Sequence, residues 1–257
     1  MRNAWRSRIA LLFLGALAGL VWGCGAGTIP AVHSEPERLT LAHRMMEQRR
    51  WASASELLKS YIQNNPGSGE VDEAVYQLGI CYLRQHDWAL AATEFERMAR
   101  DYPESDSTPS ASFRLGEALY AQARPPDFDQ DFTNKAIDQW KNYLRDYPGH
   151  WLNPEAERQE VMARSRLATK MIATGDLYLR LDLPGPARVY YERVVQDYGD
   201  TLLLGRALLG EARCDVKQKH DDLAIERLRD VEQRFPGMTV ALEAARERSR
   251  LERRHKP

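Results

Sequence analysis

The chain alternates short helical stretches, in which apolar residues recur every three or four positions, with turns that contain proline or glycine. Within this alternation one pattern occurs five times: a small residue, a bulky apolar residue four positions later, and a turn residue eight positions after that. The copies are Ala54/Leu58/Pro66, Ala91/Phe95/Pro103, Ala136/Trp140/Pro148, Ala187/Tyr191/Gly199 and Ala224/Leu228/Pro236. Because proline and glycine end helices, each copy predicts a helix that stops just before its turn residue.

A second helical pattern precedes each copy and carries a small residue one turn before another bulky one. The clearest example is Leu78-Gly79 with Tyr82. From Asp72 to Ser105 the combined spacing resembles one complete tetratricopeptide (TPR) unit. Two such helices cannot bury their apolar faces alone, so the units must stack. The sequence therefore predicts an all-α, right-handed superhelical solenoid of five TPR helix pairs, with residues 238–257 as a C-terminal capping helix and basic tail.

The repeats are not uniform, because their small anchor residues lie 37, 45, 51 and 37 positions apart. The third repeat carries an insert from Arg124 to Asp131 between its helices, and the fourth has an elongated first helix from about Pro154 to Arg180. The three aspartates of the insert lack the glycine and the distal glutamate of a calcium-binding loop. They indicate a solvated turn that caps the following helix.

The first 23 residues have the parts of a bacterial export signal: basic residues at the start and an apolar core from Ile9 to Trp22, too short to span a membrane. The core leads into Leu20-Val21-Trp22-Gly23-Cys24, which resembles the lipobox of bacterial lipoproteins. This resemblance implies that Cys24 is lipidated and that residues 24–36 form a linker. The alternative is a signal that is uncleaved, or cleaved in the ordinary way. Gly25, in place of aspartate, points to the periplasmic face of the outer membrane.

The charge balance and the lack of catalytic motifs both indicate a protein that acts by binding. The whole chain has 36 basic and 37 acidic residues, and removing the three arginines of the signal leaves a formal charge of −4, which gives no indication of nucleic-acid binding. The sequence contains no His-Glu-x-x-His, Gly-x-Ser-x-Gly or phosphate-loop motif, so it predicts no catalytic residues, no metal site and no cofactor. Cys81 and Cys214 are expected to be thiols of the helix core.

In a TPR array the first helices line the concave side, and residues not used for packing face a groove. Placing the first helices of this sequence in that arrangement predicts a groove lined by apolar and aromatic side chains, which would bind an extended or turn-like peptide. The alternative is that several of these side chains belong to the core. The candidate residues are Leu39, His43, Met46, Tyr76, Ile80, Leu83, Phe113 and Tyr120.

A lipobox followed by five TPR repeats of unequal spacing resembles the BamD family, the lipoproteins of the outer-membrane β-barrel assembly machinery. The resemblance is carried by Ala91 to Pro103, Asp129 to Pro148, Arg166 to Tyr178, and Ala187 to Thr201. It implies a protein that helps to fold and insert β-barrel proteins and is not an enzyme. Repeats one and two (residues 37–105) would bind the C-terminal signals of unfolded outer-membrane protein substrates. Repeats three to five (residues 106–237) would hold the POTRA region of a BamA-like barrel protein.

The sequence departs from the family in the second helix of repeat four. An arginine common in the family falls at Tyr190, and Arg188 and Arg193 lie close enough to substitute for it, so these three residues are the expected partner-binding positions. Two other interpretations stay open. One is a TPR lipoprotein of another envelope system, such as cell-division coordination or polysaccharide export; the other is a periplasmic hydrolase.

Overall fold

The computed structural model describes residues 34–254, so the predicted signal peptide and the lipidation site Cys24 lie outside the described part of the chain. Residues 34–254 form eleven α-helices and no strand. The helices are α2 (Glu35–Glu47), α3 (Trp51–Asn64), α4 (Val71–Gln85), α5 (Trp88–Asp101), α6 (Thr108–Ala121), α7 (Asp131–Asp146), α8 (Asn153–Arg180), α9 (Pro184–Asp197), α10 (Leu204–Lys217), α11 (Asp221–Arg234) and α12 (Thr239–Arg254). None of these helices is both long and apolar enough to cross a bilayer.

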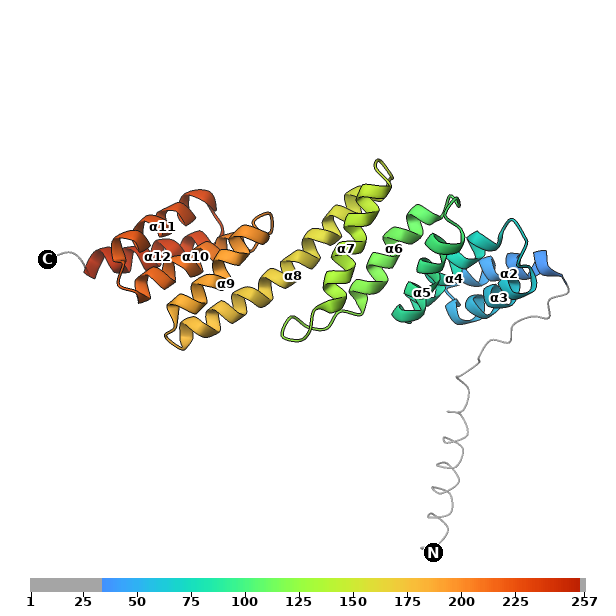
Figure 1. Ribbon diagram of the computed structural model, residues 1–257, viewed down its shortest axis with the longest axis horizontal. Helices are drawn as coiled ribbons and strands as arrows, with labels where there is room; N and C mark the ends of the chain where they lie inside the picture. The colour runs from blue at the N-terminus through green and yellow to red at the C-terminus, as the bar shows by residue number, and fades with distance from the viewer. Residues whose placement is uncertain (1–33, 255–257) are drawn as a thin grey trace, which may run out of the picture.

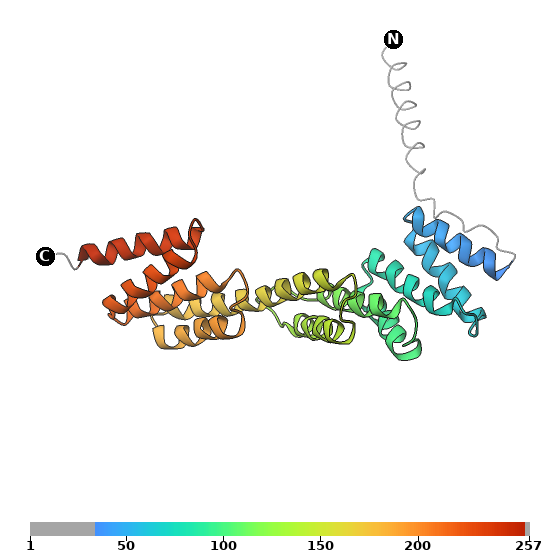
Figure 2. The ribbon, with the colours of Figure 1, turned by 90° about the horizontal axis from the view of Figure 1, so that it is seen from above.

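The helices are arranged as an elongated array in chain order, from α2 and α3 at one end to α12 at the other (Figures 1 and 2). Each helix packs on the next one along the chain, so α2 to α11 make five antiparallel pairs and α12 covers the last pair. The predicted TPR solenoid with its capping helix is therefore confirmed.

The five-fold sequence pattern explains where the second helices end and what they bury. The helices α3, α5, α7, α9 and α11 each end two residues before the proline or glycine of their copy. The small and the bulky residue of every copy are fully buried. The pattern thus fixes both the length of each second helix and the face that packs against its neighbours.

Glycines in the first helices allow the paired helices to approach closely. A Cβ atom added at Gly79 would lie 2.5 Å from the ring of Phe95, and one at Gly116 would overlap the indole of Trp140. Each glycine therefore provides the space that the bulky residue of its own repeat occupies.

We expect Gly79→Ala to lower the free energy of unfolding by about 1.5 kcal/mol, because the added methyl group overpacks against Phe95. In an exposed helix the same change would stabilise by about 1 kcal/mol, so the sign of the effect tests the packing. The matched control is Gly69→Ala in the turn before α4, where no atom beyond the chain neighbours lies within 4 Å of the added Cβ. Urea unfolding followed by circular dichroism compares them, and equal stability of both variants would contradict the close approach at Gly79.

The long helix α8, with 28 residues, belongs to two hydrophobic cores. Ala156 and Ala163 pack in the core that contains Trp140 of repeat three, whereas Ala168 and Ile172 pack in the core that contains Tyr191 of repeat four. The prediction of an elongated first helix in repeat four is confirmed, and α8 is the element that connects the two ends of the array (Figure 1).

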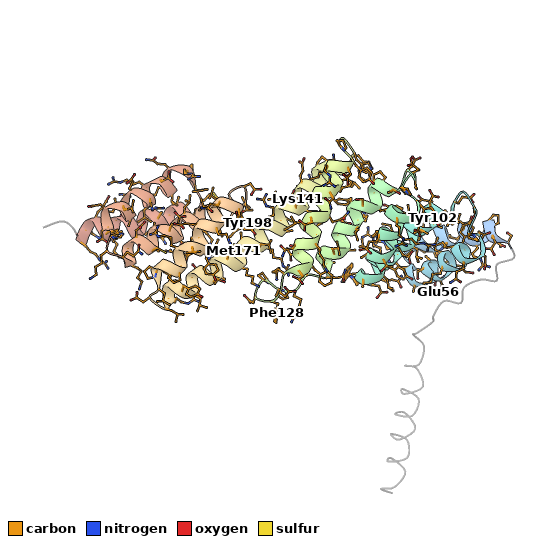
Figure 3. The ribbon with its side chains drawn as sticks, viewed as in Figure 1. Glu56, Tyr102, Phe128, Lys141, Met171 and Tyr198 are labelled. Carbon is orange, nitrogen blue, oxygen red and sulfur yellow. The ribbon has the colours of Figure 1, made fainter. Side chains whose placement is uncertain are left out.

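The insert between α6 and α7 is organised by Gln130 and not by its aspartates. Gln130 is buried, and its Nε2 donates to the carbonyl oxygens of Pro125 at 2.8 Å and of Asp129 at 3.1 Å. Lys170 of α8 donates to the carbonyl oxygen of Phe128 at 2.6 Å, while the Phe128 ring projects outward (Figure 3). No aspartate side chain caps α7, so the expected capping role was wrong.

Candidate protein-binding grooves

A groove lies between α4 and α6, the first helices of repeats two and three. It has a volume of about 400 Å³ and is called the first-helix groove below. Its lining residues are Leu83, Arg84, His86, Trp88, Arg114, Glu117 and Ala121. The helices α4 and α6 contact each other directly, so the groove lies where these two first helices meet.

The structure does not gather the eight predicted groove residues in one recess. Leu83 lines the first-helix groove. Seven of the eight are half-buried, and five of these pack against the core of the first repeats: Leu39, Met46, Tyr76, Ile80 and Leu83. His43 is half-buried on α2, and its Nε2 is buried without a hydrogen-bond partner. Tyr120 is half-buried, with its ring 5.8 Å from that of Trp140.

Phe113 was predicted to line the groove, and this prediction was wrong. Its side chain is fully buried, with its ring 5.8 Å from that of Tyr143 on α7. The backbone carbonyl oxygen of Phe113 also accepts a hydrogen bond from Trp140 Nε1 at 3.3 Å. Phe113 therefore faces the second helix of its own repeat, and its neighbour Arg114 lines the groove instead.

The charged residues of the first-helix groove were not predicted from the sequence. Arg114 donates through Nη1 to Glu117 Oε2 at 2.6 Å. Burial opposes the charge of Arg114, but the hydrogen bond and the negative charge of Glu117 outweigh it and raise the pKa of the guanidinium. The sequence signal for this pair is the three-residue spacing of Arg114 and Glu117 on one helix face, a common surface arrangement that does not by itself indicate a site.

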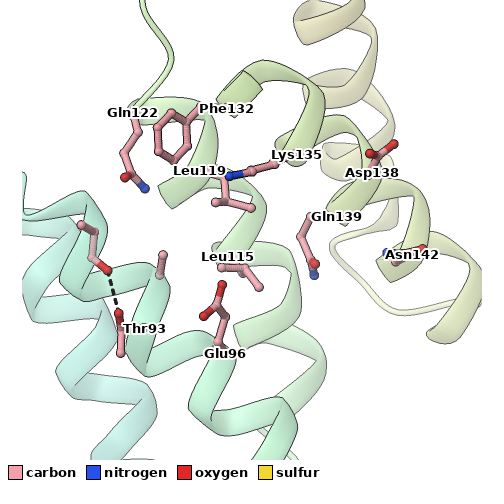
Figure 4. Close-up of a pocket in the computed structure, with 12 residues that line it drawn as sticks. Thr93, Glu96, Leu115, Leu119, Gln122, Phe132, Lys135, Asp138, Gln139 and Asn142 are labelled. Carbon is pink, nitrogen blue, oxygen red and sulfur yellow. Dashed lines mark hydrogen bonds between the residues drawn. The ribbon is translucent and has the colours of Figure 1, made fainter. Parts of the chain in front are cut away.

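A second groove, of about 460 Å³, lies between the second helices α5 and α7, with α6 beneath it (Figure 4). Leu115 and Leu119 of α6 line it together with Phe132 of α7. Glu96 of α5 and Lys135 of α7 add opposite charges. Nothing in the sequence pattern predicted this groove, because it depends on the distance between helices that are not adjacent in the chain.

The expected partner-binding residues on α9 differ in their surroundings. Arg188 donates through Nη2 to Asp215 Oδ1 on α10 at 2.5 Å, and only 1% of the Asp215 side chain is exposed. Tyr190 stacks on Tyr178 with the ring centroids 5.6 Å apart. Arg193 is 62% exposed and lies 3.8 Å from Asp197. Arg188 is thus engaged within the array, whereas Arg193 is presented to solvent.

Asp215 is the centre of a charged cluster between repeats four and five. Arg227 Nε of α11 lies 3.0 Å from Asp215 Oδ2, in an ion pair whose geometry is not that of a hydrogen bond. Arg227 also pairs with Glu211 through Nη1. Burial raises the pKa of Glu211, although the positive charge of Arg227 opposes the shift. The cluster therefore links the second helices of both repeats through buried acids on α10.

The two cysteines within residues 34–254 are buried free thiols, which confirms their prediction as core residues. Burial raises the pKa of Cys81 to about 12 and that of Cys214 to about 11. Both thiols are therefore protonated and unreactive near neutral pH.

Residues 40–217 match the family described as YfiO, outer membrane lipoprotein. The outer membrane protein assembly factor BamD of Vibrio cholerae serotype O1 is 25% identical over 199 residues, which cover 73% of this chain and 83% of that protein.

Solved structures of TPR proteins are more distantly similar. A TPR protein from Parabacteroides merdae has 15% identity and a TM-score of 0.38, with 84% of this chain and 72% of that chain covered. The TPR2AB domain of yeast Sti1 in its pHSP90 complex has 12% identity and a TM-score of 0.43, with 85% of this chain and 83% of that chain covered. The fold assignment rests on the five helix pairs of this chain and not on these loose likenesses.

Proposed function

This chain belongs to the YfiO family of outer membrane lipoproteins, and from that membership we propose that it is an assembly factor that helps to insert β-barrel proteins into the outer membrane. The observation that carries the proposal is the extent of the family match, residues 40–217, which runs from the first helix pair into repeat five. The relative from Vibrio cholerae, whose name describes such a factor, supports the same role.

The finer division of labour is part of the proposal. Repeats one and two bind the C-terminal signals of unfolded barrel substrates, and repeats three to five hold the POTRA region of a BamA-like barrel protein. The first-helix groove at the boundary of repeats two and three supports the first role, and the exposed Arg193 beside Tyr190 supports the second. Lipid on Cys24 anchors the protein on the periplasmic face, and the protein acts by binding and not by catalysis.

A pull-down of the tagged mature protein from detergent-solubilised envelopes tests the proposed function. We expect recovery of a POTRA-containing barrel protein in near-equal amount. Cys24→Ser is the control for anchoring, because it removes the lipid attachment site and leaves the described helices unchanged. Recovery of cell-division or polysaccharide-export proteins in place of a barrel protein would assign the array to another envelope system.

We expect Leu83→Arg to weaken the binding of an aromatic-ended substrate peptide by about tenfold, which corresponds to about 1.4 kcal/mol. Leu83 is half-buried in the first-helix groove and packs against the core of the first repeats, so the new charge removes apolar contact area from the groove. The matched control is Leu90→Arg on α5 of the same repeat, because Leu90 is 49% exposed and lies outside this groove. Fluorescence anisotropy measures affinity and circular dichroism measures folding. Equal weakening by both variants would argue against this groove.

A further inference from the structure

The turns that follow the five second helices share a pattern of hydrogen bonds. In each of them the residue two positions after the turn proline or glycine donates its backbone N–H to the carbonyl oxygen three residues earlier. In three of these turns the side-chain hydroxyl of that residue also accepts the backbone N–H two positions further on, at 3.3 Å. The three residues are Ser68, Ser105 and Thr201. Hydroxyl side chains stabilise turns in this way, and each bond fixes the entry into the next helix.

The turn between α7 and α8 has His150 at this position (Figure 1). Its Nδ1 accepts the backbone N–H of Leu152 at 3.4 Å and lies 2.6 Å from the hydroxyl oxygen of Tyr143. The turn before α4 has the same arrangement with a hydroxyl, because Tyr61 Oη lies 2.9 Å from Ser68 Oγ. An imidazole titrates near neutral pH, whereas a serine or threonine hydroxyl does not. The turn between α7 and α8 therefore depends on a titratable group where its equivalents do not.

The contacts of His150 determine which ring nitrogen carries the hydrogen. The N–H of Leu152 can only donate, so Nδ1 must present its lone pair and the neutral ring carries its hydrogen on Nε2. The Tyr143 hydroxyl then donates to Nδ1, and this is its one hydrogen bond within residues 34–254. Tyr143 is fully buried, and burial raises its pKa to about 12, so the hydroxyl keeps its hydrogen. A proton added to Nδ1 would face the N–H of Leu152 and leave the Tyr143 hydroxyl without an acceptor.

The other groups around the turn do not favour a charged imidazole. Burial lowers the pKa of His150, and no charge in the described helices contributes to this shift. Asp146 of α7 and Glu155 of α8 each pair with an arginine of their own helix, and the charge of Arg114 on α6 acts on Glu155. Burial also raises the pKa of Tyr147, so this neighbour stays neutral. The imidazole is half-buried, so a proton can still reach it from solvent.

We propose that the turn between α7 and α8 is a pH-sensitive joint, in which protonation of His150 breaks the hydrogen bonds at Nδ1 and loosens the start of α8. The closed turn has the lowered pKa, so the open turn binds the proton more readily. The turn is therefore closed above the usual titration range of histidine and opens as the pH falls through that range. Because α8 continues from the core of repeat three into that of repeat four, acid loosens the connection between the two ends of the array. This property belongs to the array itself and goes beyond the proposed function.

Hydrogen exchange of the first turn of α8 tests the joint on the full mature chain. It is compared at about pH 7.5 and about pH 5.5, on either side of the usual histidine range, after correction for the intrinsic effect of pH on exchange. We expect the native turn to open about tenfold more often at the lower pH, because a buried donor then lacks its acceptor. His150→Ser installs the side chain of the equivalent turns, and its opening should change by less than about twofold. The α9–α10 turn, which has Thr201, is the control within the same molecule and should not respond to pH.

A second measurement needs no variant. In protein labelled with ¹⁵N-histidine, the nitrogen chemical shifts of His150 are expected to show the hydrogen on Nε2 at neutral pH. A hydrogen on Nδ1 would overturn the hydrogen-bond assignment and with it the joint. Equal opening of the α7–α8 turn at both pH values would overturn the joint even with the expected tautomer. Equal loosening of the α9–α10 turn in acid would show a general effect of pH on the array and would overturn it as well.

Discussion

Trp140→Ala is expected to lower the free energy of unfolding by about 4 kcal/mol, the largest effect of a single substitution that we anticipate in this chain. Trp140 is fully buried in the core of repeat three, and its indole fills the space left by Gly116. The substitution leaves a cavity and removes the hydrogen bond from Nε1 to the carbonyl oxygen of Phe113. Urea unfolding followed by circular dichroism measures the change.

The control for Trp140→Ala is Trp151→Ala, only eleven positions along the chain but 72% exposed in the turn before α8. Its expected effect is below about 0.5 kcal/mol, because an exposed side chain leaves no cavity. If the two tryptophans contributed equally to stability, the packing of α6 on α7 through Gly116 and Trp140 would be incorrect.

Arg188→Met is expected to destabilise the last two repeats by about 3 kcal/mol, because it leaves the buried Asp215 with only one of its two arginine partners. Methionine keeps much of the length of the side chain but not its charge. The loss should be visible as earlier unfolding of the C-terminal repeats in hydrogen exchange, with α2 to α5 protected as in the native protein.

Arg193→Met on the same helix is the comparison, since the 3.8 Å pair with Asp197 is exposed and contributes less than about 1 kcal/mol. We expect Arg193→Met to weaken POTRA binding while stability is unchanged. Recovery of less partner with Arg188→Met at native stability would instead make Arg188 a direct partner contact.

The array could be predicted from sequence because its determinants are local. Each second helix is marked by a small residue, a bulky residue and a turn residue at fixed spacing, and each first helix by a glycine or alanine that must face a large neighbour. Gly79 with Phe95 and Gly175 with Tyr191 are both 16 positions apart, so in these repeats the same pattern fixes both the elements and their contacts, whereas the insert of repeat three widens the spacing of Gly116 and Trp140 to 24.

The grooves could be predicted only in part, because they depend on rotation about a helix axis and on helices that are not neighbours. Phe113 is fully buried, whereas Arg114, one position further along the helix, lines the groove. An aromatic side chain suits both a core and an apolar binding face, so the residue type at position 113 did not decide between the two. Arg188 was expected to meet a partner because it is charged and near the family position, but its pairing with Asp215 depends on the next repeat. No pattern in the sequence predicted the groove between α5 and α7.

The continuity of α8 has a geometric consequence for related chains. Because one unbroken helix of 28 residues belongs to the cores of both repeats three and four, its length sets the angle between the two ends of the protein. Each residue added in its middle would turn repeats four and five by about 100° and displace them by about 1.5 Å. A change of seven residues would restore the original direction to within about 20°. Chains that keep the two ends of the array in the same relative orientation should therefore vary in α8 by nearly whole numbers of turns, such as about seven or eleven residues, or not at all.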